Sequence, residues 1–287
     1  MTMLRVAAVQ MCGGREVAAN MASAEGLIRE AADGGAKYVQ TPEMTDVIER
    51  DRAALLRAIS PEESHPAVAR FCALARELGI HLHVGSLAIL LPGGQVANRA
   101  YFIRPDGAIA ARYDKIHMFD VDLDGGESWR ESRTYRPGDR AVVADAGGAR
   151  FGLSICYDVR FPQLYRALAK GSANVLTVPA AFTRQTGEAH WHVLLRARAI
   201  ENGAFVVAAA HGGRHEDGRD TYGHSMVVDP WGRVIAEAGT EPGIVVADID
   251  LEESDKARRR IPALKHDRPF ALPGEAGGGP RIRAIGR

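Results

Sequence analysis

The sequence lacks several features that mark common protein classes. It has only three cysteines among 287 residues, Cys12, Cys72 and Cys156, and a small odd number gives no disulfide framework and favours a reducing compartment. No apolar run approaches the roughly 20 residues that span a bilayer. Residues 1–11 lack the basic region and long apolar core of a signal peptide. We therefore expect a cytoplasmic protein without a membrane anchor.

An excess of either charge is also absent. The formal net charge is +0, with 36 basic and 36 acidic residues, so no overall field would attract nucleic acid or an anionic membrane surface. A hydrophobic content of 46% with 25% charged residues is typical of a globular domain. No repeat and no linker divides the chain. We expect one domain over residues 1–270, followed by a mobile tail rich in Gly, Pro and Arg over residues 271–287.

Apolar runs alternate with helix-periodic stripes along the chain, which is typical of an α/β fold. The runs predict strands at residues 4–10, 37–41, 81–91, 96–103, 108–113, 151–155, 174–178, 204–210, 222–229, 233–237 and 244–249. The stripes predict helices at residues 17–32, 66–78, 161–168 and 189–202. Tight turns at 92–94 and 105–107 indicate antiparallel or mixed pairing nearby. Residues 120–139 and 180–188 are predicted loops, and the first is long enough to be functional.

The stretch 151–179 contains the first candidate for chemistry. A buried strand ends at Cys156, and a short turn, a helix and a second buried strand follow. Open α/β folds place reactive groups at the carboxyl ends of their strands. Free cysteine is also among the most buried residue types. Position alone therefore leaves a nucleophile and a packed core thiol equally open.

Two more strand ends carry ionisable side chains, Glu43 and Lys115, and the long loop carries Glu131. A thiol with a pKa near ~8.5 needs a neighbouring base or cation to become a nucleophile. A carboxylate can accept its proton, and a lysine can stabilise the oxyanion that forms when a carbonyl is attacked. Taken alone, Glu43 is more simply interpreted as a solvated loop charge. Together with Cys156, however, these three residues form a set with the chemistry that nucleophilic catalysis requires.

Other catalytic patterns have little support. The sequence contains no G-x-S-x-G elbow, no G-x-G-x-x-G cradle and no Walker lysine. A Cys–His protease is conceivable, but none of the ten histidines shows a signature spacing. His81 and His83 share one strand face, yet neither a cysteine pair nor HExxH accompanies them. We expect these two histidines to be packed or on the surface, and we predict no metal site.

Four separated segments resemble the nitrilase superfamily of carbon–nitrogen hydrolases, in that family's order. They are PE at 42–43, YDKIHMFD at 113–120, ESRTYRPGD at 131–139 and CYDVRFP at 156–162. The resemblance covers about residues 4–270. Later segments, TGEAHWHVLLRARAIE from Thr186 and YGHSMVVDPWG from Tyr222, look most like the Nit branch. One departure is Gln40-Thr41, where the family more often has apolar residues.

The resemblance implies a role for each candidate. Cys156 would be the nucleophile and Glu43 the general base. Lys115 would stabilise the oxyanion together with the backbone N–H of Tyr157, and Glu131 would help to position substrate and lysine. The implied fold is a single-domain, four-layer α-β-β-α sandwich that forms a homodimer or a higher homo-oligomer. Neither a metal nor an organic cofactor is implied.

Three further residues are weaker candidates for substrate binding. Arg160 could bind a substrate carboxylate or equally tie down its own loop. Thr186 and His190 lie in the predicted loop and helix start after a strand end, close enough in topology to touch substrate. For all three a structural role is at least as well supported. We expect Trp191, Tyr222, His224 and Trp231 to be structural or interfacial.

The expected reaction is hydrolysis of a small linear amide by a cysteine amidase. Within the Nit branch the favoured substrate is deaminated glutathione, cut to 2-oxoglutarate and cysteinylglycine. The alternative is an ω-amide such as 2-oxoglutaramate or 2-oxosuccinamate. More distant alternatives are an N-carbamoyl amidohydrolase, a nitrilase and a non-catalytic, partner-binding homologue. The complete Glu–Lys–Glu–Cys set argues against the last of these.

Overall fold

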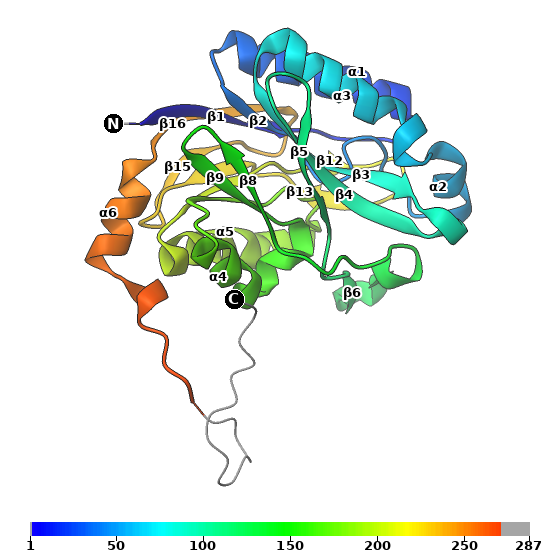
Figure 1. Ribbon diagram of the computed structural model, residues 1–287. Helices are drawn as coiled ribbons and strands as arrows, with labels where there is room; N and C mark the ends of the chain where they lie inside the picture. Colours follow the sequence, from blue (N-terminus) through cyan, green and yellow to red (C-terminus); the bar gives the residue numbers. More distant parts are fainter. Residues whose placement is uncertain (1, 271–287) are drawn as a thin grey trace.

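Two sheets pack face to face between two layers of helices (Figure 1). The computed structural model describes residues 2–270. Helices α1 (Val17–Asp33) and α3 (Pro66–Leu78) lie on one side of the sheets, and α4 (Pro162–Lys170) and α5 (Arg184–Asn202) lie on the other. The expected four-layer α-β-β-α sandwich is confirmed. The predicted tail, 271–287, lies outside the described residues.

The first sheet has the order β16-β1-β2-β3-β4-β5. Its strands are β1 (Met3–Gln10), β2 (Tyr38–Gln40), β3 (His81–Leu90), β4 (Val96–Ile103), β5 (Ile109–Asp114) and β16 (Gly243–Asp250). Strands β1, β2 and β3 are parallel, whereas β4, β5 and β16 pair antiparallel. The antiparallel pairing of β3, β4 and β5 confirms the expectation from their tight turns.

The second sheet has the order β15-β14-β11-β10-β9-β8. Its strands are β8 (Val142–Ala146), β9 (Ala149–Leu153), β10 (Val175–Thr177), β11 (Phe205–Ala208), β14 (Met226–Val228) and β15 (Val234–Glu237). Strands β9, β10 and β11 are parallel and are joined through α4 and α5. Their carboxyl ends therefore lie at one edge of the sheet, where open α/β folds build their sites.

The alternation of side chains in the buried strands separates two cores. In β1, Val6 and Ala8 face the second sheet, whereas Ala7 and Val9 pack under α1 and α3, as the period of two requires. The ring of Tyr38 from the first sheet stacks on Phe151 from the second at 4.2 Å between centroids. Such a pair adds about 0.5–1.5 kcal/mol beyond its burial. This aromatic pair therefore packs the two sheets directly against each other.

Two predicted boundaries were wrong. Residues 184–188 were predicted as loop, but α5 already begins at Arg184. Gly187 in its first turn is a packing position, because a Cβ there would lie 2.3 Å from the Tyr222 side chain. The predicted strand 222–229 is two strands, β13 (Asp220–Tyr222) and β14, since His224 between them has a left-handed φ of +55°.

The sequence patterns did not predict several short helices and strands. Helix α2 (Arg52–Ala58) depends on its cap, in which Asp51 accepts from the amide of Ala54 at 2.7 Å. Helix α6 (Glu252–Arg260) buries only Ser254 and Ala257 and so lacks an apolar stripe. The predicted loop 120–139 contains a small hairpin, β6 (Asp120–Asp122) and β7 (Ser128–Arg130). Strand β12 (Gly212–Arg214), which pairs with β13, was also missed.

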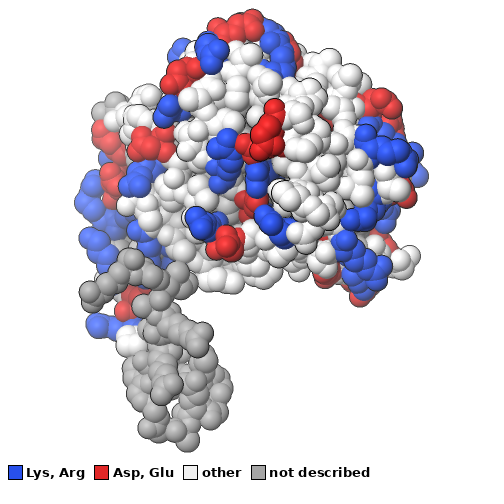
Figure 2. Space-filling view, turned by 45° about the vertical axis from the view of Figure 1, so that its right-hand side comes forward, with Lys and Arg blue, Asp and Glu red and all other residues white. Residues whose placement is uncertain are grey.

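Charged side chains of both signs are interspersed over the face shown in Figure 2, in keeping with the balanced composition. No helix among residues 2–270 is both long enough and apolar enough to cross a membrane.

Candidate active site

Cys156 lies where β9 turns into the 3-10 turn Cys156–Arg160. Its φ is +48°, a left-handed conformation that is uncommon for a residue other than glycine. Such strain costs on the order of 1–3 kcal/mol and occurs mostly at functional sites. The amide of Cys156 donates to the Pro179 carbonyl at 2.8 Å, which fixes the turn against the end of β10. The side chain is 7% exposed and lines a cavity.

Asp158 ties this turn to the strand that carries the candidate lysine. Its buried carboxylate accepts from the amide of Ile155 at 2.9 Å and from the Tyr113 hydroxyl at 2.7 Å. It also accepts from the amide of His117 at 3.0 Å. Because Tyr113 and His117 flank Lys115, the nucleophile turn and the lysine are held by one carboxylate.

Glu43 follows β2 in a loop held from two sides. Its neighbour Met44 has a φ of +53° and donates its amide to Ser86 Oγ at 2.8 Å. Strand β3 passes so close that a Cβ at Gly85 would lie 2.1 Å from the Thr41 carbonyl oxygen. Only glycine fits at that point. Close packing of the backbone against β3 therefore fixes the position of the loop that carries Glu43.

The Glu43 carboxylate lies at the centre of a hydrogen-bonded group. Its Oε1 accepts from Lys115 Nζ at 2.8 Å and from Asn98 Nδ2 at 2.9 Å. Its Oε2 accepts from the amide of Ala181 at 2.9 Å. The thiol of Cys156 lies near this carboxylate, whose negative charge acts on the thiol. Lys115 and Cys156 are therefore both neighbours of Glu43.

Glu131 holds Lys115 from the other side. Lys115 Nζ lies 3.0 and 2.9 Å from the two oxygens of Glu131. Glu131 is held in turn by the amide of Phe119, which donates to Oε2 at 2.6 Å. The lysine side chain is only 2% exposed. The structure thus brings together all four catalytic candidates, Glu43, Lys115, Glu131 and Cys156.

Burial and the neighbouring charges set the protonation of this group. Burial and the negative charge of Glu43 raise the pKa of the Cys156 thiol well above its usual range. Burial opposes ionisation of Lys115, but Glu131 and Glu43 raise its pKa well above its usual value. Burial raises the pKa of Glu43, yet the charge of Lys115 and the hydrogen bonds lower it further. At neutral pH a protonated thiol therefore lies beside a carboxylate and an ammonium group.

Sequence reasoning missed two residues that position Glu43. Asn98, which donates to Glu43, also lies 3.2 Å from Glu131 Oε1. His211 Nδ1 accepts from the amide of Gly13 at 3.2 Å, so Nε2 carries the proton and donates to the Glu43 carbonyl at 2.9 Å. Burial lowers the pKa of His211 to about 3, which keeps the ring neutral. His211 follows a buried strand, a signal that could have found it.

The four residues line a cavity of about 470 Å³, within the range of small-ligand sites. Its wall also contains basic and aromatic side chains, among them Arg50, Arg52, Phe119, Trp129, Arg130, Arg133, Tyr135, Tyr157, Phe182 and Arg219. Two of the predicted substrate-binding residues, Tyr157 and Thr186, lie in this wall.

The other two predicted substrate-binding residues, Arg160 and His190, are not part of the cavity wall as the described residues form it. Arg160 Nη1 donates to His190 Nδ1 at 3.3 Å. The guanidinium carbon of Arg160 lies 5.2 Å from the centre of the Phe182 ring. Since Phe182 does line the cavity, Arg160 is a neighbour of the cavity wall.

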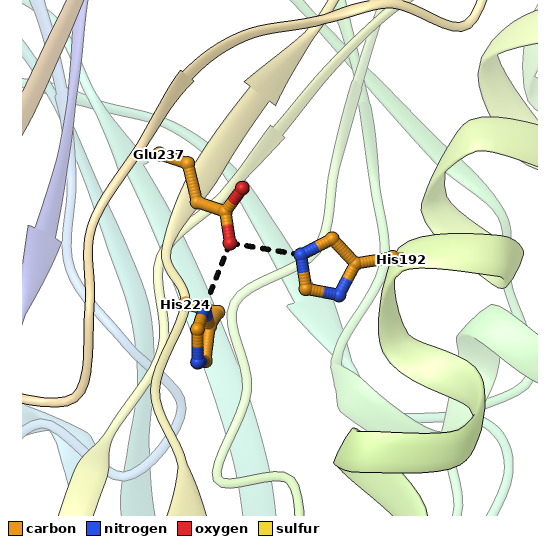
Figure 3. A group of neighbouring side chains, drawn as sticks. All are labelled: His192, His224 and Glu237. Atoms are coloured by element: carbon orange, nitrogen blue, oxygen red, sulfur yellow. Dashed lines mark hydrogen bonds and ion pairs between the residues drawn. The ribbon is translucent and has the colours of Figure 1, made fainter.

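A second cluster, His192, His224 and Glu237, could hold a metal ion (Figure 3), because its ligand atoms lie within 4.8 Å of one another. One oxygen of Glu237 lies 2.8 Å from His192 Nε2 and 2.7 Å from His224 Nδ1. Hydrogen bonds alone therefore satisfy the group. Among the described residues none of these three lines the cavity of Cys156. His83, considered earlier as a ligand, is buried and bonded to the Tyr38 hydroxyl at 2.9 Å.

This fold and site define a hydrolase. Residues 5–259 match the family model described as carbon-nitrogen hydrolase. The chain therefore belongs to the carbon–nitrogen hydrolase family, the nitrilase superfamily, and hydrolyses carbon–nitrogen bonds other than peptide bonds. The resemblance drawn from the four sequence segments is confirmed.

Two relatives belong to the Nit branch. The chain is 39% identical over 265 residues to the protein named deaminated glutathione amidase of Synechocystis sp., covering 91% of this chain and 96% of that one. It is 36% identical over 268 residues to omega-amidase NIT2 of Homo sapiens, covering 93% and 96%.

Two solved structures have the same fold. Nit3 of Saccharomyces cerevisiae, a member of branch 10 of the nitrilase superfamily, superposes with a TM-score of 0.83 at 31% identity, covering 92% of this chain and 96% of that one. The amidase from Nesterenkonia sp. AN1 superposes with a TM-score of 0.75 at 28% identity, covering 90% and 98%. That structure is a glutamate-to-glutamine variant in which acrylamide has added to the active-site cysteine.

Proposed function

We propose that this protein is a cysteine amidase that cleaves deaminated glutathione to 2-oxoglutarate and cysteinylglycine. The observation that carries the mechanism is that Lys115 Nζ lies 2.8 Å from Glu43 and that the Cys156 thiol lines the same cavity close to that carboxylate. The substrate is proposed from the relatives named deaminated glutathione amidase and from the basic cavity wall.

The first half of the reaction forms a thioester. Cys156 Sγ gives its proton to Glu43 and attacks the amide carbonyl, whose π electrons move onto oxygen. Lys115 and the Tyr157 amide, which lies in the first turn of a helix where N–H groups lack intrahelical acceptors, stabilise that oxyanion. When the intermediate collapses, the C–N bond breaks and Glu43 returns the proton to the leaving amine.

The second half releases the acid. Glu43 removes a proton from water, whose oxygen attacks the thioester carbonyl. The C–S bond then breaks, and the sulfur recovers the proton from Glu43, so the enzyme ends as it began. Glu131 holds the lysine in place through both halves by its two contacts of 3.0 and 2.9 Å. No step requires a metal or an organic cofactor.

Arg160 is the proposed partner of the 2-oxo acid carboxylate, since a bidentate arginine would orient that end and place the amide carbonyl over the thiol. Its guanidinium carbon lies 5.2 Å from the centre of the Phe182 ring and 5.8 Å from that of Tyr157, and both rings line the cavity. The alternative is ω-amidase activity, which the 36% identity to omega-amidase NIT2 favours. Deaminated glutathione and 2-oxoglutaramate have the same 2-oxoglutaryl acyl group and differ only in the leaving group.

The substrate proposal is tested by kcat/KM on a panel. We expect deaminated glutathione to be cleaved fastest, 2-oxoglutaramate more slowly, and a simple nitrile essentially not at all. The reason is the size and charge of the cavity, which accommodates a peptide leaving group. A clear preference for 2-oxoglutaramate would move the assignment to ω-amidase. Preference for a nitrile or a carbamoyl compound would contradict the substrate class.

We further propose a homodimer formed through the outer face of α5. Val193 and Ile200 on that helix are 66% and 55% exposed, and Trp231 and Ile235 nearby are 51% and 42% exposed. Single exposed apolar residues are normal, but a group of four marks an interaction surface. The close approach of Gly232 to the Ile200 side chain places the turn of Trp231 against the helix.

Substitution at this surface should separate the subunits. Val193→Asp combined with Ile200→Asp places two charges in the proposed contact, so we expect sedimentation analysis to show a monomer. The matched control is Met3→Asp, since Met3 is also 55% exposed but lies on β1. A double variant that sediments like the unaltered protein would contradict this interface.

We also assign the catalytic unit to residues 1–270 and the protein to the cytoplasm. Its three cysteines are free, and Cys12 is exposed. An exposed thiol without a partner is best preserved in a reducing compartment.

A further inference from the structure

Two arginines lie over one tryptophan in the cavity wall. The guanidinium carbon of Arg50 lies 4.2 Å from the centre of the Trp129 ring, and that of Arg219 lies 4.7 Å from it. The three residues come from separate segments, the loop after β2, strand β7 and the loop between β12 and β13. Stacking on a ring holds a guanidinium plane in place while leaving its N–H groups available. We call this group the Trp129 stack.

Lys115 and Arg130 in the wall are paired with carboxylates, whereas Arg52 and Arg133 have no ion pair among residues 2–270. Lys115 lies between two glutamates, and Arg130 donates to both oxygens of Asp122 at 2.7 and 2.9 Å. Arg50, in contrast, has no carboxylate partner within residues 2–270. Arg219 has one, since its Nη2 lies 3.2 Å from Asp217 Oδ2. The stack therefore contributes unpaired positive charge to the cavity through Arg50.

Arg219 also has an unused donor. Its Nε is buried and lacks a hydrogen-bond acceptor among the described residues, although the side chain is 15% exposed and lines the cavity. A buried donor without an acceptor destabilises the folded protein, and such groups are rare in folded proteins. An acceptor supplied by a ligand would remove this penalty. A planar carboxylate fits best, because it accepts two parallel bonds from a guanidinium fork.

We propose that the Trp129 stack binds the terminal carboxylate of the leaving peptide. This assignment rests on the proposed function. Deaminated glutathione has a carboxylate at each end, and the glycine end is separated from the cleaved bond by two residues, about 7 Å when extended. A cation beside Cys156 cannot serve that end, whereas a cation elsewhere in the same cavity wall can. Arg219 and Arg50 are thus specificity-determining residues for the leaving group.

The assignment predicts a loss that depends on the substrate. Arg219→Gln removes one cation from the stack, so kcat/KM on deaminated glutathione should fall at least about tenfold, the effect of one charge-assisted hydrogen bond. The same variant should cleave 2-oxoglutaramate at the unaltered rate, because ammonia has no carboxylate. Normal turnover of 2-oxoglutaramate also shows that the variant is folded. Arg219→Lys keeps the charge but loses the planar fork. Its kcat/KM on deaminated glutathione should therefore lie between those of the unaltered enzyme and of Arg219→Gln.

A neutral analogue of the substrate makes the test independent of protein folding. Deaminated glutathione with a glycine amide in place of the glycine acid should be cleaved at least about tenfold less efficiently by the unaltered enzyme. In Arg219→Gln, which keeps Arg50, the difference between the acid and the amide should become much smaller. The control variant is Arg184→Gln, which removes the same charge from an exposed arginine paired with Glu188 at 2.9 Å outside the cavity wall. It should keep the full difference between acid and amide.

Three results would overturn the assignment. Equal losses on deaminated glutathione and 2-oxoglutaramate would place Arg219 at the shared acyl half. An undiminished preference for the acid in Arg219→Gln would remove Arg219 from substrate recognition while leaving the proposed function intact. Failure of the unaltered enzyme to cleave deaminated glutathione at all would overturn the proposed function, and the assignment with it.

Discussion

Cys156→Ala should abolish amide hydrolysis while leaving the fold intact. In the proposed mechanism the reaction begins with the bond between Sγ and the substrate carbonyl, and Cys156 is the one thiol that lines the cavity among the described residues. Alanine keeps the Cβ, so the left-handed backbone with φ of +48° is strained no more than before. Steady-state kinetics on deaminated glutathione and on 2-oxoglutaramate should therefore show no turnover above background, with an unfolding midpoint close to that of the unaltered protein.

Cys72→Ala serves as the matched control for this substitution. Cys72 is partly buried in α3 and lies outside the cavity wall, so its removal should leave kcat unchanged. Appreciable turnover by Cys156→Ala would contradict covalent catalysis, whatever the other variants show.

Glu43→Gln and Lys115→Met should have the next largest effects. Loss of a general base typically lowers the rate about 10²–10⁴-fold, and loss of an oxyanion donor about 10²–10³-fold. We expect at least these decreases in kcat. Glutamine keeps the shape of Glu43 and can still accept from the Ala181 amide at 2.9 Å, so the first variant should remain stable.

Lys115→Met requires a compensating variant, because it leaves Glu43 and Glu131 buried without their cation. Breaking such a pair typically destabilises a protein by about 3–5 kcal/mol. The double variant Lys115→Met/Glu131→Gln removes one of the two stranded charges. It should recover part of the stability lost on thermal unfolding without recovering kcat. If its kcat returned toward normal, the lysine would have a structural role only.

Much of the site follows from one topological rule. Glu43, Lys115 and Cys156 each follow the end of a predicted strand, and the structure brings them together in the wall of one cavity. The role of Glu131 is predicted by the family resemblance, because residues 120–139 have neither an apolar periodicity nor a predicted strand end. The fold likewise follows from buried apolar runs, whose alternation separates the inter-sheet core from the core under α1 and α3.

The rest of the site depends on contacts between distant segments. Asn98 lies inside the buried strand β4, and only the nearby position of Glu43 gives it a role. Arg219 lies in a short polar turn whose sequence does not indicate that Trp129 packs against it. The sequence around Gly187 likewise does not indicate that this glycine packs against Tyr222 within α5. Local pattern carries no information about such pairings.

The most direct test of the central claim is detection of the acyl-enzyme. Unaltered protein and Glu43→Gln would be mixed with excess deaminated glutathione, quenched in acid within one turnover and analysed by intact mass and peptide mapping. The account predicts a 2-oxoglutaryl group on Cys156, released by hydroxylamine as a thioester and absent from Cys156→Ala. Product formation without an adduct on Cys156 at any quench time, or an adduct on Cys12 or Cys72 instead, would contradict it.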